Sequence, residues 1–303
     1  MSSDSPPWFV ISPDGSIDAL AVPERLLRHP ELLQRGITPC APLHKIGVVY
    51  RTDDLAGGPV HVIKILDPST EEVAIHERLL REIKRPNNYT IPSELTATGH
   101  PLLIMPMLGD VIFMREEVWC PRILLDIIFQ LVEGADFLHS LHIVHMDMCP
   151  DNVLGASSRH AATYEGIVAH RLYIIDFNTS RQFALGPGIQ GAITLPEAQV
   201  DPPNGLQHFD PYSWDVYCAG RTLERLVQQR FTRVPKPPHW VAQKYIQWLI
   251  GDERGCYGVC HCRPTARAAL KVVLVLRWAV DAPKGYEWVF DTLSGLWPSD
   301  KEE

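Results

Sequence analysis

The sequence predicts an α+β protein in which a small antiparallel sheet precedes a mostly helical remainder. Two β-branched runs, at 47–54 and 59–66, flank Ala56-Gly57-Gly58, where glycine supplies the positive φ of a hairpin turn. A long run at 120–142 then repeats apolar residues at helical spacing, as does the run at 213–229. A chain of 303 residues can hold one large domain or two smaller lobes with cores of their own.

The composition is that of an ordinary soluble globular protein, with an apolar fraction of 46%. The formal net charge of −8 disfavours a general nucleic-acid binder, which would carry a basic patch. The sequence lacks both a secretory signal pattern and a stretch of about 18 uncharged apolar residues, so we expect no membrane partner. Seven cysteines without such a signal favour reduced thiols, and hence a soluble protein of the cytoplasm or nucleus.

Residues 1–35 show a different sequence pattern from the strands that follow them. They mix proline and glycine turns with one short helical pattern that starts at Pro23 and is interrupted at Pro30. We expect an extension that packs on the main domain and is split into two helical turns.

One lysine in the second β-branched run is unusual for its surroundings. Strand alternation places Lys64 on the same face as Val62 and Leu66, although an edge-strand lysine in water explains the run equally well. A helix follows, with Glu71 and Glu72 at the positive end of its dipole. Glu77 lies in the middle of this helix, where most glutamates are solvated.

A His-x-Asp-x4-Asn motif directly follows the long apolar helix and consists of His145, Asp147 and Asn152. A carboxylate that accepts a proton, beside an amide oxygen that holds a cation, suits phosphoryl transfer, which depends mostly on positioning and charge stabilisation. The spacing alone is a weak signal. A buried strand at 171–180 ends in Asp176-Phe177-Asn178 and adds a second carboxylate.

The order of these motifs resembles the eukaryotic protein kinase domain over about residues 36–280. Strand lysine, helix glutamate, hinge, His-x-Asp-x4-Asn, Asp-Phe-Asn, Pro-Glu, Asp-Val-x3-Gly and Arg-Pro-Thr-Ala follow one another as in that family. The resemblance implies a two-lobed fold. Its N-lobe and hinge, an antiparallel sheet with one helix, would span 36–109, and its mostly helical C-lobe would span 110–303.

The resemblance also implies an ATP site between the lobes. Lys64 would contact the α- and β-phosphates and be held by Glu77, with Glu72 as the alternative partner. Met105 would be the gatekeeper, and a hinge N–H would come from Met107 or Leu108. The remaining implied contacts, with adenine or ribose, are Val49, Val62, Asp110 and Leu154, of which Asp110 could equally be a helix cap.

The resemblance assigns the chemistry to three polar residues besides Lys64. Asp147 would orient the acceptor hydroxyl and take its proton, while Asn152 and Asp176 would bind Mg²⁺ through oxygen donors.

Four further residues match structural positions of the family. Asp215 would brace the loop that carries the His-x-Asp-x4-Asn motif, called the catalytic loop below. Glu197 would form a buried salt bridge with Arg263. Thr194 could stand for the threonine that touches the base in serine/threonine kinases, although the alignment slips there.

The phosphate-binding loop departs from the family pattern. Of its three glycines and its valine the sequence offers Gly47 and Val49, while Pro42 lacks an N–H and His44 adds bulk. Val62 replaces a small alanine and narrows the adenine pocket.

The catalytic motifs depart as well. Met146 replaces an arginine, so a phosphorylated activation loop lacks its built-in receiver. Cys149 replaces a lysine that steadies the γ-phosphate, and losing one such contact typically costs about 3 kcal/mol of transition-state stabilisation. Asn178 replaces a glycine, but asparagine tolerates a left-handed backbone. The loop between Asn152 and Asp176 is longer than usual and reads as a tolerated surface insertion.

Two functions fit these observations best. The first is an active kinase that transfers the γ-phosphate of MgATP to a protein Ser/Thr hydroxyl, without control by activation-loop phosphorylation. The second is a pseudokinase, a nucleotide-binding or scaffolding module. A small-molecule phosphotransferase shares the His-x-Asp-x4-Asn loop but not the Pro-Glu and Arg-Pro-Thr-Ala motifs. A zinc site is a separate hypothesis for Cys256, Cys260, His261 and Cys262, whose spacing is irregular.

Overall fold

Five strands of the first third of the chain form one antiparallel sheet. In the computed structural model, which describes residues 7–43, 47–53, 58–115, 119–203, 206–231, 240–251 and 258–281, the strand order is β3-β4-β5-β7-β6. The strands are β3 (Pro39–Pro42), β4 (Val49–Thr52), β5 (His61–Ile65), β6 (Glu94–Leu95) and β7 (Leu102–Pro106). The predicted pairing of the two β-branched runs is confirmed by the β4–β5 ladder, whereas the turn at Ala56 and Gly57 lies outside the described residues.

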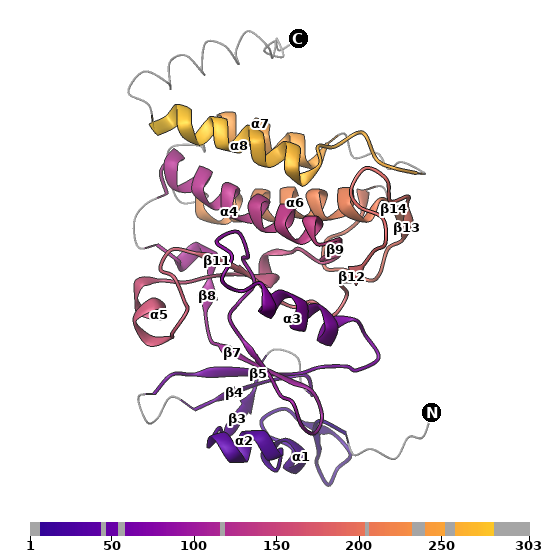
Figure 1. Cartoon of the computed structure of the whole chain (residues 1–303). Coiled ribbons are helices and arrows are strands. Elements are labelled where there is room, and N and C mark those ends of the chain that lie inside the picture. Colours follow the sequence, from indigo (N-terminus) through magenta and orange to yellow (C-terminus); the bar gives the residue numbers. More distant parts are fainter. Residues whose placement is uncertain are drawn as a thin grey trace.

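The N-terminal residues pack on one face of this sheet. They form β1 (Val10–Ile11), β2 (Ile17–Asp18), α1 (Glu24–Leu27) and α2 (Pro30–Arg35), with Pro30 in the first turn of the second helix as expected. Leu26 and Leu32 are fully buried in a cluster with Tyr50 and Ile63 of the sheet. Figure 1 shows these two short helices on the side of the sheet that faces away from the rest of the molecule.

The opposite side of the sheet carries α3 (Glu72–Arg81), which lies between the sheet and the helical part of the molecule (Figure 1). Ile75 and Leu79 of this helix are fully buried in the core of the helical part. The helix is therefore a contact between the two halves of the fold.

The helical part stacks α4 (Pro121–Ser140), α6 (Pro211–Phe231), α7 (Trp240–Ile250) and α8 (Ala266–Asp281), which Figure 1 shows as neighbouring layers. The apolar repeat in α4 contributes to the core of the helical part, because Ile127, Ile128 and Leu131 are all fully buried. None of the described helices has the length and apolar character that a membrane span requires. The predicted α+β class is confirmed.

Short ladders connect the helices and carry the site. They are β8 (Gly109–Asp110) with β10 (Val153–Gly155) and β11 (Leu172–Ile174), β9 (Ile143–Val144) with β12 (Arg181–Gln182), and β13 (Ile193–Thr194) with β14 (His208–Phe209). Two 3₁₀ turns, Val111–Phe113 and Pro150–Asn152, follow β8 and precede β10.

The long loop between Asn152 and Asp176 is more than the tolerated surface insertion that we predicted. It contains α5 (Ser158–Thr163), and the following Tyr164 donates its hydroxyl hydrogen to the carbonyl oxygen of Val60 at 2.6 Å. Ile167 of the same loop is buried beside Val62 and Met105. Helix α5 itself lies on the surface as predicted, without buried residues, while Tyr164 ties the loop to the strand sheet.

Candidate active site

Lys64 lies at the centre of a charged cluster that joins three elements. It occupies β5, an inner strand, and is 5% exposed, which rules out the alternative of an edge-strand lysine in water. Its Nζ lies 2.5 Å from Glu72 Oε1 at the start of α3 and 2.5 Å from Asp176 Oδ1 after β11. The lysine, the helix glutamate and the Asp-Phe-Asn aspartate therefore meet at one point.

The partner of Lys64 on α3 is Glu72, not Glu77, so our first expectation was wrong and the alternative is confirmed. Because α3 begins only seven residues after β5, its first turn is the part nearest to the lysine. Five residues along a helix correspond to a rotation of about 140° around its axis, so Glu77 points away and is exposed.

The two carboxylates of this cluster are held in their ionised form. Burial tends to raise the pKa of Glu72, but the adjacent His76, with Nε2 at 3.7 Å, and the Lys64 ammonium outweigh it and lower the pKa. Burial likewise opposes ionisation of Asp176, and the Lys64 charge again lowers its pKa. The cluster thus carries two negative charges and one positive charge at neutral pH.

Asp147 and Asn152 face each other across the catalytic loop. The 3₁₀ turn at Pro150–Asn152 brings the Asn152 Nδ2 to 2.9 Å from the carbonyl oxygen of Asp147 and 3.1 Å from its Oδ2. Both residues are buried, at 6% and 4% exposure. The predicted spacing of this motif therefore corresponds to direct contact between the carboxylate and the amide.

Helix α6 fixes the backbone of this loop through Asp215, in agreement with the bracing role that we expected. Asp215 is fully buried and accepts hydrogen bonds from the backbone N–H groups of His145 at 2.7 Å and Met146 at 2.8 Å. His139 Nε2 lies 3.1 Å from the same carboxylate. Met146 adopts a left-handed backbone with φ of 70°, which an L-residue tolerates only when its surroundings hold it.

Edge-on contacts between aromatic rings link the loop to α3. The Phe177 ring lies between His76, at 5.2 Å, and His145, at 4.9 Å, with edge-on geometry to both. The neighbouring Asp176 takes a left-handed backbone, with φ of 64°. We expected that conformation at Asn178, which does not adopt it, so the strained residue is the carboxylate that contacts Lys64.

The two substituted positions of the catalytic loop are both fully buried. Met146 places an apolar side chain where the family has a cation. Burial, together with the charge of Asp147, raises the pKa of the Cys149 thiol to about 12, so it is neutral at physiological pH. Cys149 therefore cannot supply the positive charge that a lysine would bring to this position.

Most of the predicted adenine-contacting residues gather in one apolar cluster. Its buried members include Val62, Met105 and Leu108, and its partly buried members include Val49, Met107 and Leu154. The N–H of Met107 donates to the carbonyl oxygen of Val60 at 3.0 Å, so one of the two hinge N–H groups that we considered is already engaged within the protein. Asp110 accepts a hydrogen bond from Ile112 N at 2.9 Å, so its alternative interpretation as a helix cap is confirmed.

Two contacts expected from the resemblance do not form. Glu197 is exposed, whereas the buried Arg263 donates its Nε–H to the carbonyl oxygen of Ile250 at 2.6 Å and covers the aromatic ring of Phe209. The segment that carries Glu197 lies over the catalytic loop instead. Thr194 pairs with His208 in the β13–β14 ladder rather than with Asp147.

Gln199 makes the contact with Asp147 that we considered for Thr194. Its backbone N–H donates to Asp147 Oδ1 at 2.8 Å, and its side-chain Nε2 lies 3.3 Å from Oδ2. Sequence reasoning missed this residue because a backbone donor has no residue type. No pattern relates a glutamine to an aspartate 52 positions earlier.

The zinc hypothesis receives no support from the described residues. Cys256 lies outside them, as does His44 of the phosphate loop. Cys260 is buried and donates its backbone N–H to Asp210 Oδ2 at 3.0 Å, while His261 and Cys262 are exposed. In the described ranges, His, Cys, Asp and Glu side chains do not gather in any group of three or more with the geometry to hold a metal ion.

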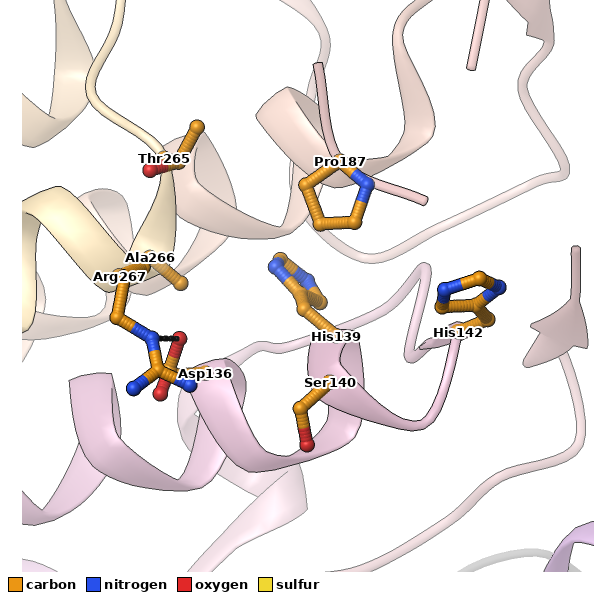
Figure 2. Close-up of a pocket in the computed structure, with 8 residues that line it drawn as sticks. All are labelled: Asp136, His139, Ser140, His142, Pro187, Thr265, Ala266 and Arg267. Carbon is orange, nitrogen blue, oxygen red and sulfur yellow. Dashed lines mark ion pairs between the residues drawn. The ribbon is translucent and has the colours of Figure 1, made fainter. Parts of the chain in front are cut away.

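A pocket of about 280 Å³ lies at the end of α4, between that helix, Pro187 and the first turn of α8 (Figure 2). Asp136 and Arg267 pair across one side of it at 3.0 Å. His139 lines the pocket and also contacts Asp215. The bracing of the catalytic loop therefore extends to this hollow in the C-terminal half.

Comparison with known proteins shows what the chain is similar to. No protein-family model matches the chain. It is 30% identical over 193 residues to the cell division control protein 2 homolog 3 of Trypanosoma brucei brucei, covering 59% of this chain and 58% of that protein. It is 25% identical over 161 residues to the probable serine/threonine-protein kinase YbdM of Bacillus subtilis, covering 49% and 58%.

A putative serine/threonine-protein kinase of Acanthamoeba polyphaga mimivirus is 24% identical over 217 residues, which cover 64% of this chain and 70% of that protein. The chain thus spans a little over half the length of the first two relatives. The fold and these similarities agree in supporting a protein kinase domain in this chain.

Proposed function

We propose that this chain is a divergent protein kinase that transfers the γ-phosphate of MgATP to a Ser or Thr hydroxyl of a protein. The observation that carries the proposal is the assembled site. Lys64 pairs with both Glu72 and Asp176, while Asp147 and Asn152 are in contact on a braced loop. A chain that had lost this chemistry would be under no requirement to keep a buried ammonium between two carboxylates, because such charges are costly unless paired.

The donor set fits Mg²⁺, a hard cation that prefers oxygen ligands. Asp176 offers a carboxylate, and Asn152 has its amide nitrogen bonded to Asp147, so its amide oxygen is the atom available to a cation. When bound, Mg²⁺ would neutralise charge on the β- and γ-phosphates. The Lys64 ammonium would contact the α- and β-phosphates, and the apolar cluster of Val49, Val62, Met105, Leu108 and Leu154 would enclose the adenine.

The reaction needs one proton acceptor, and Asp147 is placed for it. The acceptor hydroxyl oxygen forms a bond with the γ-phosphorus while the bond from that phosphorus to the β–γ bridging oxygen breaks. The hydroxyl proton passes to Asp147, and ADP leaves. Because Met146 is apolar and fully buried, a phosphate on the activation segment would find no cation at that position. We therefore propose that activation-segment phosphorylation does not control the enzyme.

A pseudokinase is the second candidate, and a specific observation favours it. Cys149 is fully buried and un-ionised where a γ-phosphate would need a cation. In that case the same cluster would bind a nucleotide without fast transfer, and the domain would act as a binding or scaffolding module.

Thermal unfolding with millimolar ATP tests the nucleotide site. We expect a rise in Tm with ATP and Mg²⁺ together, by several degrees if ATP is at about a hundred times its Kd, and little change with ATP alone. Asp176→Asn should abolish the metal-dependent part, because it removes the carboxylate from the oxygen set.

Asp151→Asn is the matched control, since Asp151 is exposed and lies beside Asn152. It should keep the wild-type shift. An equal rise without Mg²⁺, or no rise at all, would argue against a MgATP site.

A further inference from the structure

The base of the proposed reaction is already covered by the chain itself. Gln199 donates its backbone N–H to Asp147 Oδ1 at 2.8 Å and places its side-chain amide 3.3 Å from Oδ2. Oδ2 also accepts the amide of Asn152 at 3.1 Å. Asp147 is left only 6% exposed.

These contacts fill most of the accepting capacity of the carboxylate. An ionised carboxylate has about four acceptor positions, and three donors already use them here, two of them on Oδ2. A hydroxyl that transfers its proton must come within about 2.6–3.2 Å of the same carboxylate. Both positions on Oδ2 are taken, so a substrate hydroxyl that approaches Oδ2 competes there with the Gln199 side-chain amide.

The backbone of Gln199 is held in place, whereas its side chain is not. Its backbone is anchored, because the adjacent Val200 is 2% exposed and Tyr217 donates its hydroxyl hydrogen to the carbonyl oxygen of Asp201 at 3.3 Å. The β13–β14 ladder closes the same segment at its base. The residue as a whole is exposed, so its side chain can leave Oδ2 without moving the backbone.

We infer that Gln199 is both a positioning residue and a gate for the acceptor, and this inference rests on the proposed kinase function. Its backbone N–H holds Asp147 Oδ1 in a fixed orientation. Its side-chain amide occupies Oδ2 until an acceptor hydroxyl displaces it. The gate concerns the protein acceptor, since the contact lies on the base and not on Lys64 or Asp176, which would bind the nucleotide.

The variant Gln199→Ala tests the side-chain contact with Oδ2 independently of the other contacts in the site. It removes the amide from Oδ2 and keeps the backbone N–H on Oδ1. We expect the KM for a Ser/Thr peptide acceptor to fall, and kcat/KM for that peptide to rise roughly tenfold, which is the order of one hydrogen bond to a charged group. The KM for ATP and the MgATP-dependent rise in Tm should not change.

Gln207→Ala is the matched control, because it makes the same chemical change at an exposed position of the same segment. It should behave as the wild type. An unchanged or higher KM for the peptide in Gln199→Ala would overturn the gate.

A second measurement tests the contact between Gln199 and Asp147 without relying on phosphoryl transfer. Amide hydrogen exchange at residue 199 should be slow in the wild type and much faster in Asp147→Ala, because the N–H loses its acceptor. Equal exchange in both chains would overturn the positioning role. Slow exchange in a wild type that transfers no phosphate would refute the proposed function and the gate, while the contact itself would stand.

Discussion

Replacing Asp215 by alanine is expected to lower the free energy of unfolding by about 3–5 kcal/mol, as the removal of one partner from a buried charged network usually does. The carboxylate is fully buried and accepts the N–H groups of His145 and Met146 and lies within reach of His139. Each buried donor left without an acceptor costs about 1–3 kcal/mol. The left-handed backbone of Met146 would also lose the contact that holds it.

Chemical denaturation measures this loss directly, and Asp151→Ala, a change at an exposed aspartate of the same loop, is the control. The control should change stability by less than about 0.5 kcal/mol. If Asp215→Ala were equally mild, the carboxylate would not be the brace of the catalytic loop.

Replacing Lys64 by methionine should abolish the MgATP response and lower stability by about 3–5 kcal/mol near neutral pH. Glu72 and Asp176 would then keep their negative charges without the ammonium 2.5 Å away. Glu72 has a 2% exposed side chain and should account for most of the loss, since solvent screens the partly exposed Asp176.

The loss depends on pH in a direction that the pKa shifts define. In the wild type the pKa values of Glu72 and Asp176 lie below their ordinary 4.5 and 3.8. They therefore contribute stability above those values, which is lost as the pH falls through the lower folded ones. In Lys64→Met the ammonium that lowers the two pKa values is gone, while burial still raises them, so both pKa values should rise. The variant should therefore lose stability as the pH rises through the raised pKa values.

Denaturation of the wild type and Lys64→Met at about pH 5 and about pH 8 tests this direction. The difference in the free energy of unfolding between the two proteins should be smaller at the lower pH. Lys84→Met, at an exposed lysine just after α3, is the control and should show little difference at either pH. A loss of stability that is equal at both pH values would mean that the two carboxylates do not depend on Lys64.

The sequence was sufficient for features that depend on order along the chain. The sheet and the long helices follow from local patterns. The pairing of Lys64 with Asp176 and of Asp147 with Asn152 follows from the order of the motifs. Such motifs can be recognised because their residues keep a fixed order and spacing along the chain. The position of Asp215 under the catalytic loop could be predicted for the same reason.

Features that depend on rotation or on distant contacts could not be predicted. Choosing Glu72 over Glu77 requires knowing where α3 begins, because one residue turns the side chain by about 100°. Gln199 reaches Asp147 through a backbone N–H, which every residue except proline has. Glu197 is exposed, and Arg263 donates to the carbonyl oxygen of Ile250, a backbone acceptor that no residue pattern reveals.

Transfer of labelled γ-phosphate from MgATP to a protein hydroxyl, measured for the wild type and Asp147→Asn in parallel, tests most directly that the assembled site is catalytic. We predict label on Ser or Thr with the wild type and incorporation lower by roughly 10²–10⁴-fold with the variant, the usual contribution of a positioned base. Equal incorporation by both chains would show that Asp147 is not the base. No incorporation by a wild type that MgATP stabilises would contradict the kinase and leave a nucleotide-binding module.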